Sequence, residues 1–204
     1  KMRILIRNRV WQEVHSILDF LKAHNVGGEA PVVWCEALTI ELEQKDETLA
    51  LAKYKELAER VENGESLPWA AELYYRITEL TGKQLDARKP EDRAELLAIL
   101  EKGLTHDPED MDCLDYKAWL LKRDERIDEA LAIYLKLEAL PRHYLTVEQN
   151  LAEIYYKDLY KNADKALHYY RMMQERSGFG LKRAKVSCAA LDMRMQASVT
   201  CSIC

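Results

Sequence analysis

Apolar residues recur at spacings of three and four positions along most of the chain, up to about Arg176. Residues three and four apart lie on one face of an α-helix, so this spacing is typical of a helix with one buried stripe. The pattern therefore predicts an all-α protein. Three clear stripes are Val10, Trp11, Val14, Ile17, Leu18 and Leu21; Leu49, Ala52, Leu57 and Val61; and Leu131, Tyr134, Leu137 and Leu140.

Residues typical of turns interrupt these stripes. They divide the chain into predicted helices of about 12 to 20 residues, a length that suits antiparallel helix hairpins. The breaks fall at Gly27-Gly28, Asn63-Gly64, Thr81-Gly82, His106-Asp107-Pro108, Leu140-Pro141 and Ser177-Gly178.

Composition agrees with the helical pattern. Only 7 Gly and 5 Pro occur in 204 residues, and a low number of helix breakers favours long helices over a fold with many turns. With 48% hydrophobic residues the chain can bury a sizeable core. The net charge of −5 argues against a nucleic-acid partner, because proteins that bind phosphate backbones are usually basic.

The chain carries no run of apolar residues long enough for a membrane span, so we expect no integral membrane segment. Its five cysteines are odd in number and irregularly spaced, unlike the disulfide framework of a small secreted fold. Cys35 and Cys113 are instead predicted to be small buried residues. A reducing, cytoplasmic setting fits this usage.

Four segments share one arrangement of large and small residues across two consecutive predicted helices. Their members are Trp34, Ala37, Leu38, Ala50, Tyr54 and Leu57; Trp69, Leu73, Leu96, Leu100, Gly103, Leu104 and Pro108; Leu114, Ala118, Leu121, Ala130 and Tyr134; and Leu151, Ala152, Tyr155, Ala166 and Tyr170. The arrangement resembles the tetratricopeptide repeat, a helical hairpin of about 34 residues with Trp, Leu, Gly and Tyr on its first helix and Ala and Phe on its second.

The chain also departs from the pattern of that family. Extra residues centred on Gly82 to Pro90 are expected to lengthen the loop inside the second hairpin. The Gly of the family's first helix is replaced by leucine at Leu38 and Leu73. Before the first hairpin, residues 11–18 look like a lone second helix, as if the chain began inside a repeat. A helical bundle without repeats is the alternative reading.

The resemblance implies a right-handed superhelical stack of antiparallel hairpins over residues 1–177, with about four repeats after a leading helix. Residues 178–204 are predicted to form a capping helix and a disordered tail. The apolar positions Leu181, Ala184, Cys188, Leu191 and Met195 recur at helical spacing there, and a terminal repeat needs a helix with a polar outer face.

The resemblance further implies where a ligand would bind. In the family, contacts come from first-helix positions two before and one, five and eight after the Trp position, which line the concave wall. In this sequence those positions are Val32, Cys35, Thr39 and Leu42; Leu67, Ala70, Tyr74 and Ile77; Asp112, Asp115, Trp119 and Lys122; and Thr146, Gln149, Glu153 and Tyr156. The residues that we expect to contact a ligand are Thr39, Tyr74, Ile77, Asp112, Asp115, Trp119, Lys122, Gln149, Glu153 and Tyr156.

The first half of this wall is apolar, and the second half mixes acidic, amide and aromatic groups. We therefore expect a protein or peptide partner, with apolar residues at one end and a basic group toward Asp112, Asp115 and Glu153. The family's clamp for chaperone tails uses Lys and Asn, whereas this chain has Val32 and Cys35 in the first repeat. A chaperone-tail adaptor is therefore disfavoured.

No motif in the sequence indicates catalysis or a cofactor. The five histidines lack zinc-site spacing, and there is neither a glycine-rich phosphate loop nor a Gly-x-Ser-x-Gly elbow. The acidic cluster at residues 107–112 suits a turn and a helix start better than a calcium loop. We thus expect a scaffold that binds a protein segment, needs no cofactor and is not an enzyme.

Three alternatives stay open at this point. The chain could be a regulatory repeat region of a larger enzyme or signalling protein. It could be a lipid-anchored adaptor, because Cys201 begins a terminal Cys-a-a-X box. It could also be an α-helical enzyme, which would need a deep pocket with clustered titratable groups. The oligomeric state is not indicated by the pattern.

Overall fold

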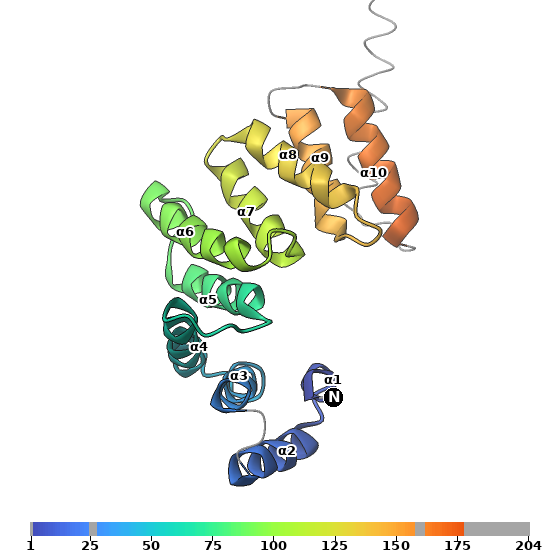
Figure 1. Cartoon of the computed structure of the whole chain (residues 1–204). Helices are drawn as coiled ribbons and strands as arrows, with labels where there is room; N and C mark the ends of the chain where they lie inside the picture. The colour runs from blue at the N-terminus through green and yellow to red at the C-terminus, as the bar shows by residue number, and fades with distance from the viewer. Residues whose placement is uncertain (1, 25–27, 158–161, 178–204) are drawn as a thin grey trace, which may run out of the picture. The chain divides into compact units, whose positions relative to one another are not determined.

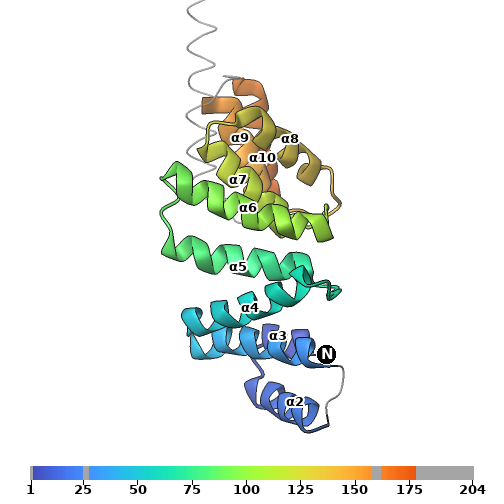
Figure 2. The same ribbon diagram turned by 60° about the vertical axis from the view of Figure 1, so that its left-hand side comes forward.

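A computed structural model of the chain describes residues 2–24, 28–157 and 162–177. All regular structure within these ranges is helical, and none of the described residues belongs to a strand (Figures 1 and 2). The prediction of an all-α protein is confirmed. The helices are α1 (Met2–Arg7), α2 (Trp11–His24), α3 (Glu29–Thr39) with its π-helical continuation η1 (Ile40–Gln44), α4 (Glu47–Glu62), α5 (Ala70–Gln84), α6 (Pro90–His106), α7 (Met111–Arg123), α8 (Ile127–Glu138), α9 (Leu145–Lys157) and α10 (Ala163–Ser177).

Short polar side chains start several of these helices. Asp46, Asp110 and Asn162 each accept a hydrogen bond from the backbone N–H three residues further along, at the starts of α4, α7 and α10. Such caps satisfy N–H groups that have no partner within the helix. Pro90 stands in the first turn of α6, where its missing N–H causes no loss. The acidic cluster around Asp110 therefore serves a helix start, as predicted.

Helices α4, α6 and α8 end where turns were predicted, at Glu62, His106 and Glu138. After α4 the chain reverses at Gly64, whose φ of +96° lies in the left-handed region that side chains with a Cβ atom rarely adopt. The break predicted at Ser177-Gly178 coincides with the last described residue.

The predicted break at Thr81-Gly82 is wrong, because α5 continues through both residues to Gln84. Leu80 and Thr81 are buried, so the packed face of α5 extends to its last turn. This packing outweighs the cost of about 1 kcal/mol for a glycine inside a helix. Since α6 already begins at Pro90, the extra residues of this segment mainly lengthen the two helices and not their loop.

The π-helix η1 was not indicated by the sequence pattern. It extends α3 without a break until Lys45, which has a φ of 63°. Hydrogen bonds in a π-helix join residues five apart, so the turn is wider than in an α-helix. Positions counted along an ideal α-helix therefore no longer apply to residues after Thr39, such as Leu42.

The chain divides into two compact units, which we call unit 1 (Lys1–Cys113) and unit 2 (Leu114–Cys204), with the boundary inside α7. Helices pack against their neighbours in sequence. In unit 1, α3 packs on α4, α4 on α5 and α5 on α6 (Figure 2). In unit 2, α9 packs on both α8 and α10 (Figure 1). Helix α1 contacts α2 and α3, so the leading helix α2 is paired and not alone.

The core of unit 1 is built around Trp34 of α3, which is 2% exposed. Its ring lies 5.4 Å from the ring of Tyr54 on α4 and 5.4 Å from that of Trp69, which immediately precedes α5. Ala37 and Ala50 are fully buried beside these large residues. One aromatic cluster thus joins a helix pair to the helix that follows it.

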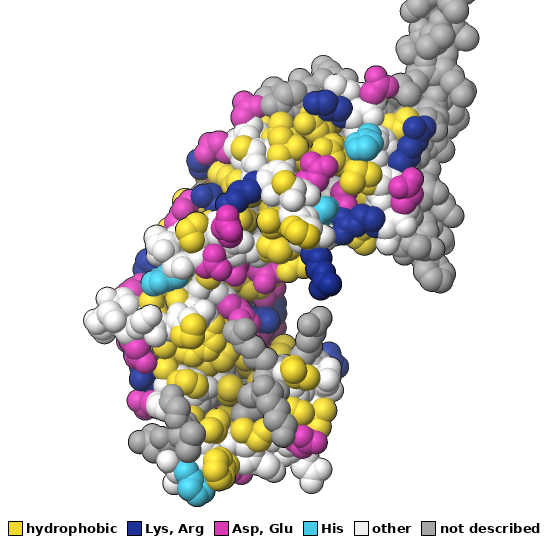
Figure 3. Space-filling view, turned by 45° about the vertical axis from the view of Figure 1, so that its right-hand side comes forward, with side chains coloured by type: hydrophobic (Ala, Val, Ile, Leu, Met, Phe, Trp, Pro, Cys, Tyr) yellow, Lys and Arg dark blue, Asp and Glu magenta, His cyan; other side chains and the backbone are white. Residues whose placement is uncertain are grey.

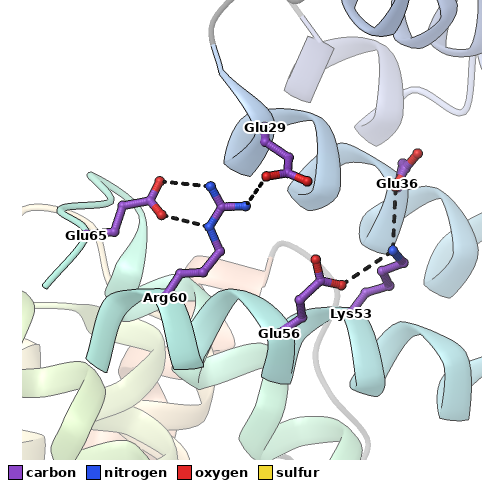
Figure 4. A network of polar contacts seen from close by, with 6 residues as sticks. All are labelled: Glu29, Glu36, Lys53, Glu56, Arg60 and Glu65. Atoms are coloured by element: carbon purple, nitrogen blue, oxygen red, sulfur yellow. Dashed lines mark hydrogen bonds and ion pairs between the residues drawn. The ribbon is translucent and has the colours of Figure 1, made fainter. Parts of the chain in front are cut away.

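Ion pairs add to the contacts between α3 and α4 at the surface (Figure 4). Arg60 donates to Glu65 through Nε, at 2.7 Å, and to Glu29 through Nη1, at 3.1 Å. Lys53 of α4 lies 4.0 Å from Glu36 of α3. Pairs this exposed contribute about 0–1 kcal/mol each, so burial of the aromatic cluster dominates the stability of unit 1.

Unit 2 repeats the alanine and tyrosine burial of unit 1. Ala130 and Tyr134 of α8 are fully buried. On α10, Ala166 is fully buried and Tyr170 is 7% exposed. Small residues at such positions let helices approach, while the large ones fill the space between them.

A buried carboxylate lies in the last helix pair. Glu148 of α9, three residues before Leu151, is 0% exposed. Nη1 of Arg176, on the last turn of α10, donates to Glu148 Oε1. His143 Nε2 lies 3.1 Å from the same oxygen. The charge of Glu148 is therefore balanced from within unit 2.

No helix in the described ranges is both long enough and apolar enough to cross a membrane. The predicted capping helix and tail at 178–204 lie outside the described residues.

Candidate binding surface

Helices α7 and α9 of unit 2 carry polar side chains that meet across the gap between the two helices. Lys122 of α7 donates from Nζ to Asn150 Oδ1, at 2.6 Å, and to Glu153 Oε2, at 3.0 Å. Nearer the start of α7, Asp115 Oδ2 accepts a hydrogen bond of 3.3 Å from Thr146 Oγ1. We call these five residues, together with Gln149, the α7/α9 seam.

The amides of the seam hold its carboxylate in place. Gln149 Nε2 donates to Glu153 Oε1 at 3.3 Å, so each oxygen of Glu153 has a donor. Asn150 donates from Nδ2 to the backbone carbonyl of Thr146, at 2.9 Å, which presents its Oδ1 to Lys122. Lys122, Asn150 and Glu153 are thus each held by more than one hydrogen bond.

The seam is half-buried. The side chains of Lys122 and Glu153 are 17% and 25% exposed. Burial opposes the ionisation of Glu153, but the hydrogen bond and charge of Lys122 outweigh it, so the pKa of Glu153 lies below its ordinary value. Glu153 is thus charged at neutral pH and remains reachable from solvent.

A buried tyrosine lies next to the seam. Tyr134 of α8 is 0% exposed, and its hydroxyl has no hydrogen-bond partner. Burial raises the pKa of this phenol, and the negative charges of Asp115 and Glu153 raise it further.

Trp119 lies on α7, between Asp115 and Lys122 in sequence, and it is partly exposed. Its ring lies 5.6 Å from that of Tyr116, and the guanidinium of Arg123 lies 4.2 Å from its centre. A cation on an indole face is favourable by about 0.5–1 kcal/mol at an exposed site. Trp119 thus presents a flat, accessible ring beside the seam.

Of the ten residues predicted to contact a ligand, the structure joins four in the seam: Asp115, Lys122, Gln149 and Glu153. Trp119 lies on the same helix as the first two. Tyr156, on α9, is half-buried.

Asp112 is half-buried at the start of α7 in unit 1. The pKa of Tyr75 is raised chiefly by burial, then by the charge of Glu79, and to a smaller extent by the charge of Asp112.

The three predicted contacts on α3 and α5 are buried, at 3% exposure for Thr39 and Tyr74 and 4% for Ile77. Tyr74, which we expected to contact a ligand, is therefore a core residue with little surface to offer. Its ring stacks on His106 of α6, with centroids 5.9 Å apart, and its Cβ lies close to Gly103. In this helix pair, Tyr74 fills the contact between α5 and α6.

The side chain of Thr39 turns back onto its own helix. Its Oγ1 donates to the carbonyl of Cys35 at 2.8 Å, so its hydrogen-bonding capacity is used inside α3.

Figure 3 shows that the face of unit 1 turned to the viewer carries a wide area of apolar side chains, whereas unit 2 mixes apolar, acidic and basic ones. On this face, charged side chains are therefore more mixed with apolar ones over unit 2.

Sequence reasoning missed one member of the seam. Asn150 lies outside the four wall positions expected from the repeat resemblance, so no rule selected it. Its bonds to Lys122 and to the carbonyl of Thr146 became visible only in the structure.

No group of three or more metal-ligating side chains occurs in the described ranges.

One other feature of unit 2 offers less to a ligand than the seam. A shallow hollow on unit 2 is lined by Leu135, Tyr155, Asp164, Lys165, His168 and Tyr169. Lys165 Nζ lies 4.8 Å from the centre of the Tyr155 ring, so the cation of this hollow already has an aromatic partner.

No protein-family model matches this chain, and no curated protein is significantly similar to it. Its function has to be inferred from the geometry of its own residues.

Proposed function

We propose that the chain is a tetratricopeptide-like helical repeat protein that binds a protein or peptide segment on the face formed by α7 and α9. Its role is scaffolding and not catalysis. The repeat assignment is supported by the pairs Ala50/Tyr54 and Ala130/Tyr134, which hold the same spacing and the same full burial in the second helix of two hairpins.

Contacts between alternate helices also support a stack of hairpins. First helices meet at Arg76 and Glu41, where α5 reaches η1, and at Lys122 and Glu153, where α7 reaches α9. Second helices meet where Tyr169 of α10 donates to Glu138 of α8, at 3.1 Å. Repeat proteins bury their core through such neighbour contacts, and their first helices line one wall.

The observation that carries the binding proposal is the exposure of fixed polar groups on α7 and α9. Lys122, Gln149 and Glu153 are held by mutual hydrogen bonds and still reach solvent, and Trp119 supplies a flat ring beside them. Pre-positioned polar groups next to an accessible aromatic ring are typical of surfaces that bind protein segments, because little entropy is lost on binding.

The compartment and the class of partner follow from charge and thiols. With a net charge of −5, a protein partner suits the surface better than a nucleic acid. Cys35 and Cys113 are buried as thiols, which favours a reducing, cytoplasmic setting.

Selection of peptides from a displayed random library against the full chain tests this proposal. Selected peptides should shift the amide NMR signals of α7 and α9. Trp119→Ala combined with Lys122→Ala should weaken their binding at least about tenfold, the loss expected for removing a hot-spot residue. The matched control is Tyr144→Ala combined with Lys136→Ala, which removes an exposed aromatic ring and a lysine of unit 2 outside the seam. Selected peptides that bind both variants equally well would refute the proposal.

A further inference from the structure

Three side chains of unit 2 meet at the end of α10. Glu148 of α9 is 0% exposed, and Arg176, in the last turn of α10, donates to its Oε1 through Nη1. His143, in the connection between α8 and α9, has its Nε2 3.1 Å from the same oxygen. We call these three residues the α10 clamp, because they join the end of α10 to α9 and to the connection before it.

The neighbours of His143 determine which of its ring nitrogens carries the proton. Nδ1 lies 3.2 Å from the backbone carbonyl of Leu140, which can only accept, so Nδ1 donates. In a neutral ring Nε2 is then an acceptor, and Nη1 of Arg176 donates to it at 2.7 Å. Nη2 of Arg176 donates to the backbone carbonyl of His143 at 2.8 Å. This set of bonds therefore requires a neutral imidazole.

A second proton on His143 is incompatible with these bonds. On Nε2 it would face the N–H of Arg176 Nη1 across 2.7 Å, so two donors of like charge would oppose each other. The same proton can instead be donated to Glu148 Oε1, 3.1 Å away, in a hydrogen bond between opposite charges. Glu148 thus has two alternative cationic partners, and the protonation of His143 decides between them.

Exposure determines which cation leaves the carboxylate. The side chain of Arg176 is 36% exposed, whereas that of His143 is 12% exposed. Water can therefore hydrate the guanidinium once it leaves, but it reaches the ring poorly. Glu148 Oε2 is buried without a hydrogen-bond partner, so the carboxylate needs one cation in place. The imidazolium is the cation that stays.

Other titratable groups of the packed elements have other positions or partners. On α8, Glu138 accepts a hydrogen bond of 3.1 Å from the hydroxyl of Tyr169 on α10. Burial, and then the charge of Glu138, raise the pKa of Tyr169, so this phenol stays neutral while an imidazole titrates. Arg142 and Glu175, which adjoin the clamp in sequence, are exposed. His143 is therefore the clamp residue whose charge changes in mild acid.

We propose that the α10 clamp is a proton-operated release, in which protonation of His143 from solvent moves Glu148 from Arg176 to the imidazolium and frees the last turn of α10. An imidazole gains its proton between about pH 8 and pH 5, so mild acid operates the release. The body of α10 stays packed, because Leu167 and Met173 are buried. The proposal does not depend on the proposed function, since it concerns only the attachment of α10.

A pH titration of the full chain from 8 to 5, followed by NMR, tests the release. The ring carbon and nitrogen shifts of His143 report its protonation and tautomer, and the Nε–H signal of Arg176 reports whether its guanidinium is bound. We expect the Nδ1–H tautomer at pH 8. As His143 gains its proton, the Arg176 signal should move to the position of a free arginine. An Arg176 signal that stays in place while His143 titrates, or a His143 that does not titrate in this range, would overturn the proposal.

Two substitutions test whether His143 is the cause. His143→Gln keeps a neutral side chain with an acceptor oxygen, so Arg176 should stay bound throughout the range. At pH 5, hydrogen-exchange protection of the last turn of α10 should be at least about tenfold lower in wild type than in His143→Gln, the loss of one hydrogen bond to a charged group. His168→Gln, which removes an exposed histidine of the same helix, should behave as wild type. Equal loss of protection in His143→Gln would contradict the proposal.

Removing the leaving cation gives a test that does not depend on how well glutamine fits. Arg176→Ala should lower the protection of the last turn of α10 at pH 8 to the level that wild type has at pH 5, and acid should lower it no further. Wild-type protection at pH 8 in Arg176→Ala would show that the guanidinium does not hold this turn, and the proposal would be wrong.

Discussion

Two buried tyrosines, each four residues after a buried alanine, have different surroundings. Tyr54 in unit 1 and Tyr134 in unit 2 are both fully buried, and burial raises the pKa of both phenols. Tyr54 is hydrogen-bonded to Glu41, which also accepts from Arg76. The hydroxyl of Tyr134 has no such bond.

The difference shows that a buried ring and its polar atom contribute separately to stability. Both rings are fully buried. In unit 1 the hydroxyl bonds to Glu41, which Arg76 joins to α5. In unit 2 the hydroxyl has no such bond. The contribution of each polar atom can be measured separately from that of the ring.

Removing the rings should have the largest effect, and it should be similar in both units. Tyr54→Ala and Tyr134→Ala each leave a cavity in a fully buried site, and each should lower the free energy of unfolding by about 3–5 kcal/mol. Urea denaturation followed by amide NMR signals of the affected unit gives both values. A loss below about 1 kcal/mol for Tyr134→Ala would show that the two positions are not equivalent.

Removing the cation should destabilise unit 1 more than unit 2. Arg76→Met leaves Glu41, whose side chain is 10% exposed, without its cation and should destabilise unit 1 by about 2–3 kcal/mol. Glu153 is already 25% exposed, so water can replace the contact that Lys122→Met removes. We therefore expect this change to lower the free energy of unfolding by only about 1 kcal/mol. Urea denaturation measures both. Equal losses of unfolding free energy would mean that water is excluded from Glu153 as fully as from Glu41.

Removing only the hydroxyls should change stability in opposite directions. Tyr54→Phe breaks a bond to a carboxylate and should lower the free energy of unfolding by about 1–2 kcal/mol. Tyr134→Phe removes an oxygen that has no partner, so it should leave stability unchanged or raise it by up to about 1 kcal/mol. A loss of stability in Tyr134→Phe would show that its hydroxyl already has a partner in solution.

Acid should weaken the seam by a smaller amount. The folded-state pKa of Glu153 is depressed below the ordinary value of a glutamic acid, so its pair with Lys122 stabilises the protein above that ordinary pKa. The contribution is lost as pH falls through the depressed pKa. The difference in urea midpoint between wild type and Glu153→Gln should therefore be present at pH 7 and vanish under acid. A difference that persists would exclude this ionisation as its cause.

The sequence predicted well where one helix face decides the structure. The repeat resemblance selected Ala50 and Tyr54, and Ala130 and Tyr134, all of which are buried. The apolar spacing alone was less accurate on α4, where Leu57 and Val61 are buried but Leu49 and Ala52 are exposed. The ends of α4 and α6 followed from local turn residues. These features depend on neighbours within about one or two helical turns, which a sequence displays directly.

Prediction was poorer where contacts cross from one helix to another. Tyr74 was expected to contact a ligand, but it is buried where α5 approaches α6 closely at Gly103. The pairing of Glu148 with Arg176 joins residues far apart in sequence and follows no spacing rule. Asp115, Lys122 and Glu153 remain predicted ligand contacts, and their mutual geometry depends on side-chain bonds between α7 and α9 that the sequence does not display.

The most direct measurement is the binding site of selected peptides on the full chain, read from amide NMR shifts. Saturable shifts should be confined to α7 and α9, and Trp119→Ala combined with Lys122→Ala should weaken the binding. Shifts confined to unit 1, or binding that the double variant leaves unchanged, would contradict the account.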